Sequence, residues 1–392
     1  MTQASTAARR TLTAVALGAV ALAGISYGVT AALRVRPPHA LRRLRRRPPS
    51  AWGDEFPSRP VPASGPVRPL GEAVGKSLPS TVPWNGTEIS LDDMLRLTKS
   101  RALVVLHDGR LVHEWYAEDL DVDARLPSWS VAKAVVSLLV GQAIGRGMLS
   151  EDDLLVDLLP ELRTGTGYDE ITVRDLLDMT SGIDIAEVYN PWWPFSGVPR
   201  LMLSTDLPRY IRARRQMRFQ PGSRCEYRSI DTQMLGLILA RIHGRPLAQI
   251  ASEGLWTPIG AEADATWNLD REGGIEKAFC CVNARPRDLA RIGQMVLDGG
   301  RVGDTQVVPL AWIERISAPR QHLPDGWGYS AHWWHPPTSD GDFTALGVFG
   351  QYICLHPEAR TVIVKISDRV FEKDGTNTVD ALRVIARHLE GG

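Results

Sequence analysis

Two apolar, β-branched segments joined at Asp108-Gly109 constrain the fold of this chain more than any other feature. They span residues 101–107 and 110–116, and Asp-Gly between such runs is typical of a two-residue β-hairpin turn. Both central residues of that turn need positive φ angles, which Gly and Asp tolerate better than most residues. We therefore expect an antiparallel sheet to begin near residue 101.

Helical periodicity follows this hairpin. Apolar residues at helical spacing predict a helix from Ser130 to Gly145. Further helices are expected over residues 172–179, 231–242, 287–297 and 378–389. Strand patterns return at residues 328–334, 343–355 and 361–366. Strands at both ends with helices between them predict an α+β domain, in which helices flank an antiparallel sheet and a mostly helical subdomain is inserted.

The N-terminal segment is uncharged and apolar from residue 11 to residue 33, and about 20 such residues suffice to cross a bilayer as a helix. Arg9 and Arg10 precede it, as in a secretory signal, but a heavier load of arginines follows it. Residues 1–34 are therefore expected to be a membrane anchor or a signal segment. The chain would be membrane-associated through residues 11–33, or secreted if the segment is cleaved, and the side of the membrane stays open.

Residues 35–76 are dense in Pro and Arg and have few periodic apolar positions. This composition predicts an extended linker or wrapping arm rather than part of the core. The folded domain is then expected to span residues 77–392.

Charge and cysteine content exclude several classes of function. Lys and Arg together number 45, as do Asp and Glu, so the charge balance gives no reason to expect a nucleic-acid partner. The cysteines, Cys225, Cys280, Cys281 and Cys354, include no C-x-x-C pair, and the adjacent pair is not expected to form a normal disulfide. We expect mostly buried, apolar thiols. The nine histidines do not cluster at metal-ligand spacing, so no metal or other cofactor is expected. The sequence does not indicate an oligomeric state.

Ser130-Val-Ala-Lys133 lies at the predicted start of a helix and is the only S-x-x-K in the chain. Positions i and i+3 share one face of a helix, so the Lys133 amine can reach the Ser130 hydroxyl. A serine hydroxyl is a poor nucleophile without a base beside it, and a lysine becomes a base when burial lowers its pKa. This pattern is typical of acyl transfer through serine.

Two further motifs could complete such a site. Tyr227-Arg-Ser229 precedes the helix expected near residue 231, and a phenol there could relay a proton to the leaving group, although a core tyrosine is an equal alternative. Ala345-Leu-Gly347-Val348 lies in a predicted strand. Gly347 there could let a substrate carbonyl approach the backbone while Val348 offers an N–H group, although a bulge is the commoner role of such a glycine.

In this order the three motifs resemble the serine β-lactamase and penicillin-binding-protein superfamily over about residues 75–392, specifically its class C branch with the related esterases. Residues 179–183 followed by Tyr189, and residues 347–351, are most similar to 6-aminohexanoate-dimer hydrolase and carboxylesterase-like members. The resemblance implies a β-lactamase/transpeptidase-like fold.

The resemblance also implies a role for each site residue. Ser130 would be the nucleophile, Lys133 its base partner and Tyr227 the proton relay. The Ser130 and Val348 N–H groups would form the oxyanion hole. Substrate would be bound by Tyr189, Ser229 and Gly347. Whether Lys133 or Tyr227 takes the serine proton stays open.

The third motif departs from the Lys-Thr/Ser-Gly of β-lactamases and peptidases, because Ala345-Leu346-Gly347 supplies neither the cation nor the hydroxyl that would hold a substrate carboxylate. Hydrolysis of a small-molecule ester or short amide is therefore the leading expectation. D,D-peptidase or β-lactamase activity is one alternative. A non-catalytic, membrane-anchored binding protein is an alternative of another class.

Overall fold

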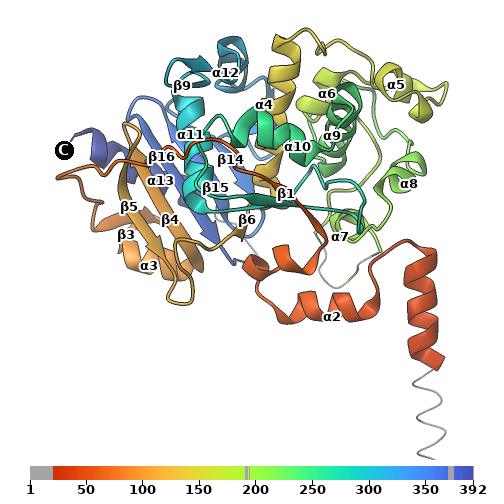
Figure 1. Ribbon diagram of the computed structural model, residues 1–392, viewed down its shortest axis with the longest axis horizontal. Coiled ribbons are helices and arrows are strands. Elements are labelled where there is room, and N and C mark those ends of the chain that lie inside the picture. The colour runs from red at the N-terminus through yellow and green to blue at the C-terminus, as the bar shows by residue number, and fades with distance from the viewer. Residues whose placement is uncertain (1–20, 190–192, 194, 370–374, 392) are drawn as a thin grey trace, which may run out of the picture.

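The structure is a computed structural model that describes residues 21–189, 193, 195–369 and 375–391. An eight-stranded antiparallel sheet is the largest of its sheets (Figure 1). Its strand order is β11-β12-β13-β14-β15-β16-β4-β5. The strands are β4 (Ser100–His107), β5 (Arg110–Tyr116), β11 (Gln321–His322), β12 (Gly328–Ser330), β13 (Trp333–His335), β14 (Phe343–Gly347), β15 (Gln351–His356) and β16 (Thr361–Ser367). The predicted hairpin is confirmed: β4 pairs with β5, and Asp108 and Gly109 have φ angles of 49° and 72°.

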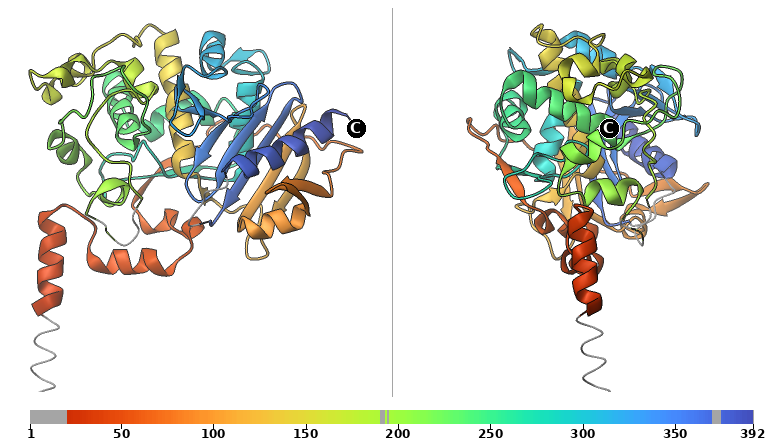
Figure 2. Two further views of the ribbon diagram at one scale, coloured as in Figure 1. Left: turned by 180° about the vertical axis from the view of Figure 1, so that it is seen from behind. Right: turned by 90° about the vertical axis from the view of Figure 1, so that its right-hand side faces the viewer.

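Each face of this sheet packs against a helix. Helix α11 (Pro286–Leu297) covers one face, and α13 (Gly375–Glu390) covers the other (Figures 1 and 2). Along β4, Val104 belongs to the core that contains α11, whereas its neighbours Leu103 and Val105 belong to the core that contains α13. This alternation follows from the two-residue period of a strand, and burial on both faces explains the continuous apolar run.

A helical region lies beside the sheet and forms the predicted insertion (Figure 1). It contains η3 (Trp129–Val131), α4 (Ala132–Gly145), α5 (Leu155–Leu158), α6 (Val173–Leu177), α7 (Gly197–Met202), α8 (Leu207–Arg212), α9 (Ser229–His243) and α10 (Leu247–Ala251). Helix α6 begins with a capping box between Thr172 and Asp175, and α9 ends at Gly244, which has a left-handed conformation.

Smaller elements complete the fold. They are α2 (Pro38–Arg46), β2 (Thr81–Trp84), β3 (Thr87–Ser90), α3 (Leu91–Leu97), β9 (Arg301–Val302), β10 (Thr305–Gln306) and α12 (Leu310–Ile316). A four-stranded sheet has the order β1-β7-β8-β6. Its strands are β1 (Ser58–Val61), β6 (Leu126–Pro127), β7 (Ala265–Asn268) and β8 (Val282–Ala284).

Two predicted strands are hairpins instead. The strand expected over residues 328–334 is β12 and β13, and that expected over residues 343–355 is β14 and β15. The reversals occur at Ala331-His332, with φ of 42° and 71°, and at Phe349-Gly350, with φ of 71° and 86°. Ala331 and Phe349 rarely adopt positive φ, and neither turn has the Asn-Gly or Asp-Gly pair typical of a two-residue hairpin, so the turn signal in the sequence is only weak there.

Part of the predicted linker belongs to the folded unit. Strand β1 pairs along its length with β7, and Val61 is buried in the main core. Helix α2 also lies within this segment, where Leu44 packs with Phe56. Residues 35–76 therefore do not form only an extended arm, because one strand of the segment is paired and several of its apolar side chains are buried.

The predicted membrane segment is described only in part. Residues 11–20 lie outside the described residues, whereas residues 21–32 are helical and project from the rest of the molecule (Figures 1 and 2). Within the described residues, no helix has the length and apolarity needed to span a membrane. Anchoring or cleavage of residues 1–34 stays a prediction.

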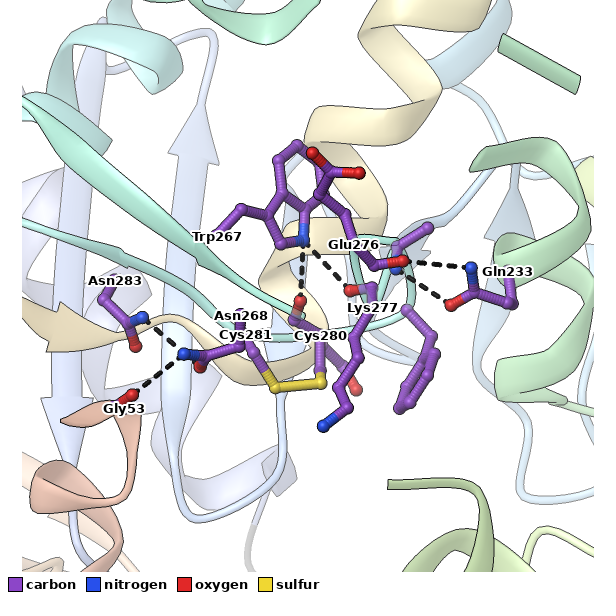
Figure 3. The surroundings of a disulfide bond; sticks show 12 residues. Gly53, Gln233, Trp267, Asn268, Glu276, Lys277, Cys280, Cys281 and Asn283 are labelled. Carbon is purple, nitrogen blue, oxygen red and sulfur yellow. Dashed lines mark hydrogen bonds between the residues drawn. A yellow bond between two sulfur atoms is a disulfide. The ribbon is translucent and has the colours of Figure 1, made fainter. Parts of the chain in front are cut away.

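The expectation for the adjacent cysteines is wrong, because Cys280 and Cys281 form a disulfide (Figure 3). The two Cα atoms are 3.7 Å apart, which is shorter than in most disulfides. Cys281 has a φ of 73° in the local turn that carries this bond. The Trp267 indole N–H donates to the Cys280 carbonyl at 3.0 Å and so holds this turn from the side. Cys225 and Cys354 are free and buried, as predicted.

Candidate active site

Ser130 lies in the turn of 3₁₀ helix that leads into α4. Its predecessor Trp129 has a φ of 48°, so the chain reverses sharply just before the serine. The predicted start of a helix at Ser130 is therefore confirmed, apart from its tighter first turn. This turn places Lys133, three residues later, on the same side of the helix.

Lys133 is buried, with 1% of its surface exposed. Its Nζ donates hydrogen bonds to Ser130 Oγ at 2.9 Å and to the Phe279 carbonyl at 2.8 Å. Burial lowers the pKa of Lys133 from 10.5 to about 7, and the negative charge of Glu187 partly opposes this change. Near neutral pH a large share of these amines is therefore unprotonated and able to accept a proton.

Tyr227 approaches the same serine from the segment before α9. Its ring centroid lies 5.0 Å from Lys133 Nζ, and the Ser130 side chain is near enough to its hydroxyl to lower its pKa slightly against the larger effect of burial. Burial raises the pKa of Tyr227 well above its usual value of 10, and the charge of Glu187 raises it further. The phenol is therefore protonated at neutral pH and can donate a proton.

The end of strand β14 lies against Ser130. A Cβ atom on Gly347 would come within 2.9 Å of the Ser128 carbonyl oxygen and 3.1 Å of the Ser130 nitrogen. Only glycine fits so close to another backbone without displacing it. Val348 follows directly and is partly buried. Ala345 and Leu346 place no cation on this strand beside the serine.

Ser229 and Tyr189 meet at a carboxylate that the sequence analysis missed. Glu187 Oε1 accepts hydrogen bonds from Ser229 Oγ at 2.6 Å and from the Tyr189 hydroxyl at 2.8 Å. Glu187 Oε2 accepts a third from the Ser229 backbone N–H at 2.9 Å. Tyr189 as a residue is 47% exposed, whereas burial raises the pKa of its hydroxyl well above 10. Glu187 belongs to no motif, and only its place two residues before Tyr189 could have drawn attention to it.

Two adjacent tryptophans of β13 point to opposite faces of the sheet. Trp334 is partly buried, and its ring centroid is 5.1 Å from that of Tyr227. Trp333 points to the other face of the sheet, where it is fully buried and packs on Phe343. Of these two, only Trp334 can face a bound substrate.

The structure thus brings the predicted residues together from distant parts of the chain. Ser130 and Lys133 come from the η3–α4 turn, Tyr227 and Ser229 from the start of α9, Gly347 and Val348 from the end of β14, and Tyr189 from a loop before α7. A hydroxyl, a buried amine and a protonated phenol in mutual contact can perform nucleophilic acyl transfer with proton relay.

Comparison with known proteins agrees with this chemistry. The family described as Beta-lactamase matches residues 98–387. The 6-aminohexanoate-dimer hydrolase of Paenarthrobacter ureafaciens is 30% identical over 301 residues, which cover 71% of this chain and 74% of that protein.

Solved structures show the same fold. A protein from Bacillus anthracis, provisionally assigned as a 6-aminohexanoate-dimer hydrolase, superposes with a TM-score of 0.78 at 24% identity and covers 87% of this chain and 93% of its own. A penicillin-binding protein from Bacillus halodurans superposes with a TM-score of 0.60 at 15% identity, covering 77% of this chain and 99% of its own.

Proposed function

The chain belongs to the β-lactamase family and is a serine hydrolase of ester or amide bonds, and we propose that Ser130 carries the acyl group during turnover. The observation that carries this proposal is the hydrogen bond from the buried Lys133 amine to Ser130 Oγ at 2.9 Å, with the Tyr227 ring centroid 5.0 Å from the same amine. The Phe279 carbonyl fixes the amine in this position.

In the proposed acylation step, Ser130 Oγ attacks the substrate carbonyl carbon while its proton passes to the unprotonated Lys133 amine, directly or through Tyr227. The carbonyl oxygen becomes an oxyanion, which accepts hydrogen bonds from the Ser130 and Val348 N–H groups. Tyr227 then donates a proton to the leaving oxygen or nitrogen and takes one from the Lys133 ammonium, so the serine proton ends on the leaving group and the acyl-enzyme forms. Water releases the acid by the reverse sequence of proton transfers.

The strand that flanks the serine supports esters and short amides as substrates. Ala345 and Leu346 occupy the place of the cation and hydroxyl with which β-lactamases and D,D-peptidases hold a substrate carboxylate. Without them, a carboxylate would lose its water and gain no partner, which is unfavourable. The relative from Paenarthrobacter ureafaciens is named for the 6-aminohexanoate dimer, and we include this amide among the substrates to be tested.

The test is hydrolysis of short-chain p-nitrophenyl esters, the 6-aminohexanoate dimer and nitrocefin by the full chain and by Ser130→Ala. We expect ester or dimer turnover that falls by at least about 100-fold in the variant. Ser137→Ala is the matched control, because Ser137 is a buried serine of α4 whose hydroxyl has no hydrogen-bond partner among the described residues. It should leave the rate unchanged.

Other outcomes identify the alternatives. Turnover of nitrocefin alone would indicate that the enzyme is a β-lactamase and not an esterase. Equal activity, or equal inactivity, of the wild type and Ser130→Ala would remove Ser130 from the mechanism and favour a non-catalytic binding protein.

A further inference from the structure

Glu187 is a charged side chain beside the proton-transfer groups that the proposed mechanism does not use. Three hydrogen bonds fix its carboxylate, two from Ser229 and one from the Tyr189 hydroxyl. Hydrogen bonds to an ionised carboxylate are stronger than neutral ones, so the three together define its position well. The carboxylate thus joins the Tyr227-Arg228-Ser229 motif to the loop that carries Tyr189.

A second contact ties the same loop to the same motif. The buried Arg228 guanidinium donates to the Ile185 carbonyl at 2.7 Å and also pairs with Glu226. Two consecutive residues after Tyr227 therefore hold this loop. Arg228 binds its backbone at Ile185, and Ser229 binds its side chain at Glu187. Displacement of the carboxylate would release Tyr189 from the rest of the site.

The charge of Glu187 also reaches the proton-transfer groups. It raises the pKa of Tyr227 and that of Lys133, although burial has the larger effect on each. The other titratable groups that face Lys133 are uncharged near neutral pH: Tyr227 from the start of α9, and His332 from the turn between β12 and β13, where burial keeps the His332 pKa well below 6.5.

We propose that Glu187 is a positioning residue, whose carboxylate holds Tyr189 and Ser229 in one arrangement beside Ser130 and places a negative charge within reach of Lys133. This inference rests on the proposed role of Ser130 as the nucleophile. Glu187 itself forms no bond to substrate in this role. It acts through Tyr189, Ser229 and Lys133.

Two substitutions separate the geometric role from the electrostatic one. Glu187→Gln keeps the length of the side chain but removes its charge. Glu187→Asp keeps the charge but shortens the side chain, so that one carboxylate no longer reaches both Tyr189 and Ser229. Asp184→Asn is the matched control, because Asp184 is an exposed acid in the same loop and loses the same charge.

The measurement is the pH profile of kcat/KM for the best ester, together with kcat and KM on the plateau. The mechanism needs an unprotonated Lys133, so kcat/KM falls as the pH drops through the Lys133 pKa. Loss of the Glu187 charge removes a group that favours the protonated amine. The acid limb of Glu187→Gln should therefore move to lower pH, whereas the limbs of Glu187→Asp and Asp184→Asn should stay in place.

On the plateau, Glu187→Asp should lose about 10- to 100-fold in kcat/KM, because a misplaced binding group weakens the alignment of substrate with nucleophile. A purely structural role would instead lower the melting temperature of both variants without moving the acid limb of Glu187→Gln. That result, or wild-type behaviour of both variants, would overturn the inference. Retained activity in Ser130→Ala would instead overturn the proposed function, so the two failures are distinguishable.

Discussion

At the scale of single residues, Lys133 combines two properties that seldom occur together in a lysine: burial and direct contact with a hydroxyl group. Its Nζ has two polar partners, Ser130 Oγ and the Phe279 carbonyl, and neither is an anion. Burial without a paired anion disfavours the ammonium form, and this explains the lowered pKa of about 7. The same environment that makes the lysine costly to bury makes it useful as a base.

This chemistry predicts the pH dependence of the wild-type enzyme. Lys133 must be unprotonated to act, and its pKa is about 7, so kcat/KM should rise through neutral pH and level off at mildly alkaline pH. Lys133→Arg should abolish the activity at every pH, because a guanidinium does not lose its proton in this range. A wild-type acid limb near the ordinary pKa of a carboxyl group would contradict this assignment.

At the scale of elements, the contact between the end of β14 and the turn before α4 forms the site. Because Gly347 has no side chain, the strand can lie close to the serine turn. A Cβ atom at this position would overlap the Ser128 carbonyl and crowd the Ser130 nitrogen. The strand itself is held by its pairing with β15, in which Gly347 lies opposite Gln351. The end of a strand that is paired on both sides thus sets the distance between the Val348 backbone and the serine.

Gly347→Ala tests this contact. Its methyl group would force the strand and the Ser130 turn apart, so we expect kcat/KM to fall by about 100-fold as the oxyanion site widens. Gly167→Ala is the control, because a Cβ at Gly167 has open space around it. Activity of Gly347→Ala close to that of the control would show that the approach of β14 is not needed.

At the scale of the whole molecule, the main sheet is assembled from both ends of the domain. Strands β4 and β5 come from the first part of the domain, and β4 pairs with β16 from the last part, while the helical region is inserted between them (Figure 1). The segment before residue 77 joins this assembly through β1, which covers the free edge of β7 and places Val61 in the main core.

Removal of residues 35–76 should therefore destabilise the fold. Residues 77–392 lack β1, leave the β7 edge unpaired and lose the burial of Val61, which by itself contributes about 1.5–3 kcal/mol. We expect a melting temperature lower by several degrees than that of residues 35–392, measured by circular dichroism. Equal melting temperatures would mean that the segment is a dispensable arm.

Local patterns in the sequence determined the hairpin at Asp108-Gly109, the helix start at Ser130 and the shared face of Ser130 and Lys133, because these depend on neighbours within a few residues. The family resemblance extended this to a proposed role for Tyr227 and to the fold, and the comparisons confirm the fold.

Only the tertiary structure decided which distant groups complete the site. The Phe279 carbonyl that holds Lys133 lies 146 residues away from it in sequence, and Glu187 lies 42 residues from Ser229. No periodicity encodes such contacts, because they arise from the packing of α4 and α9 against one loop that precedes α9 and another that follows α10. The disulfide of Cys280 and Cys281 and the turn at Ala331-His332 likewise depend on positive φ angles that the surrounding fold imposes on residues that seldom adopt them.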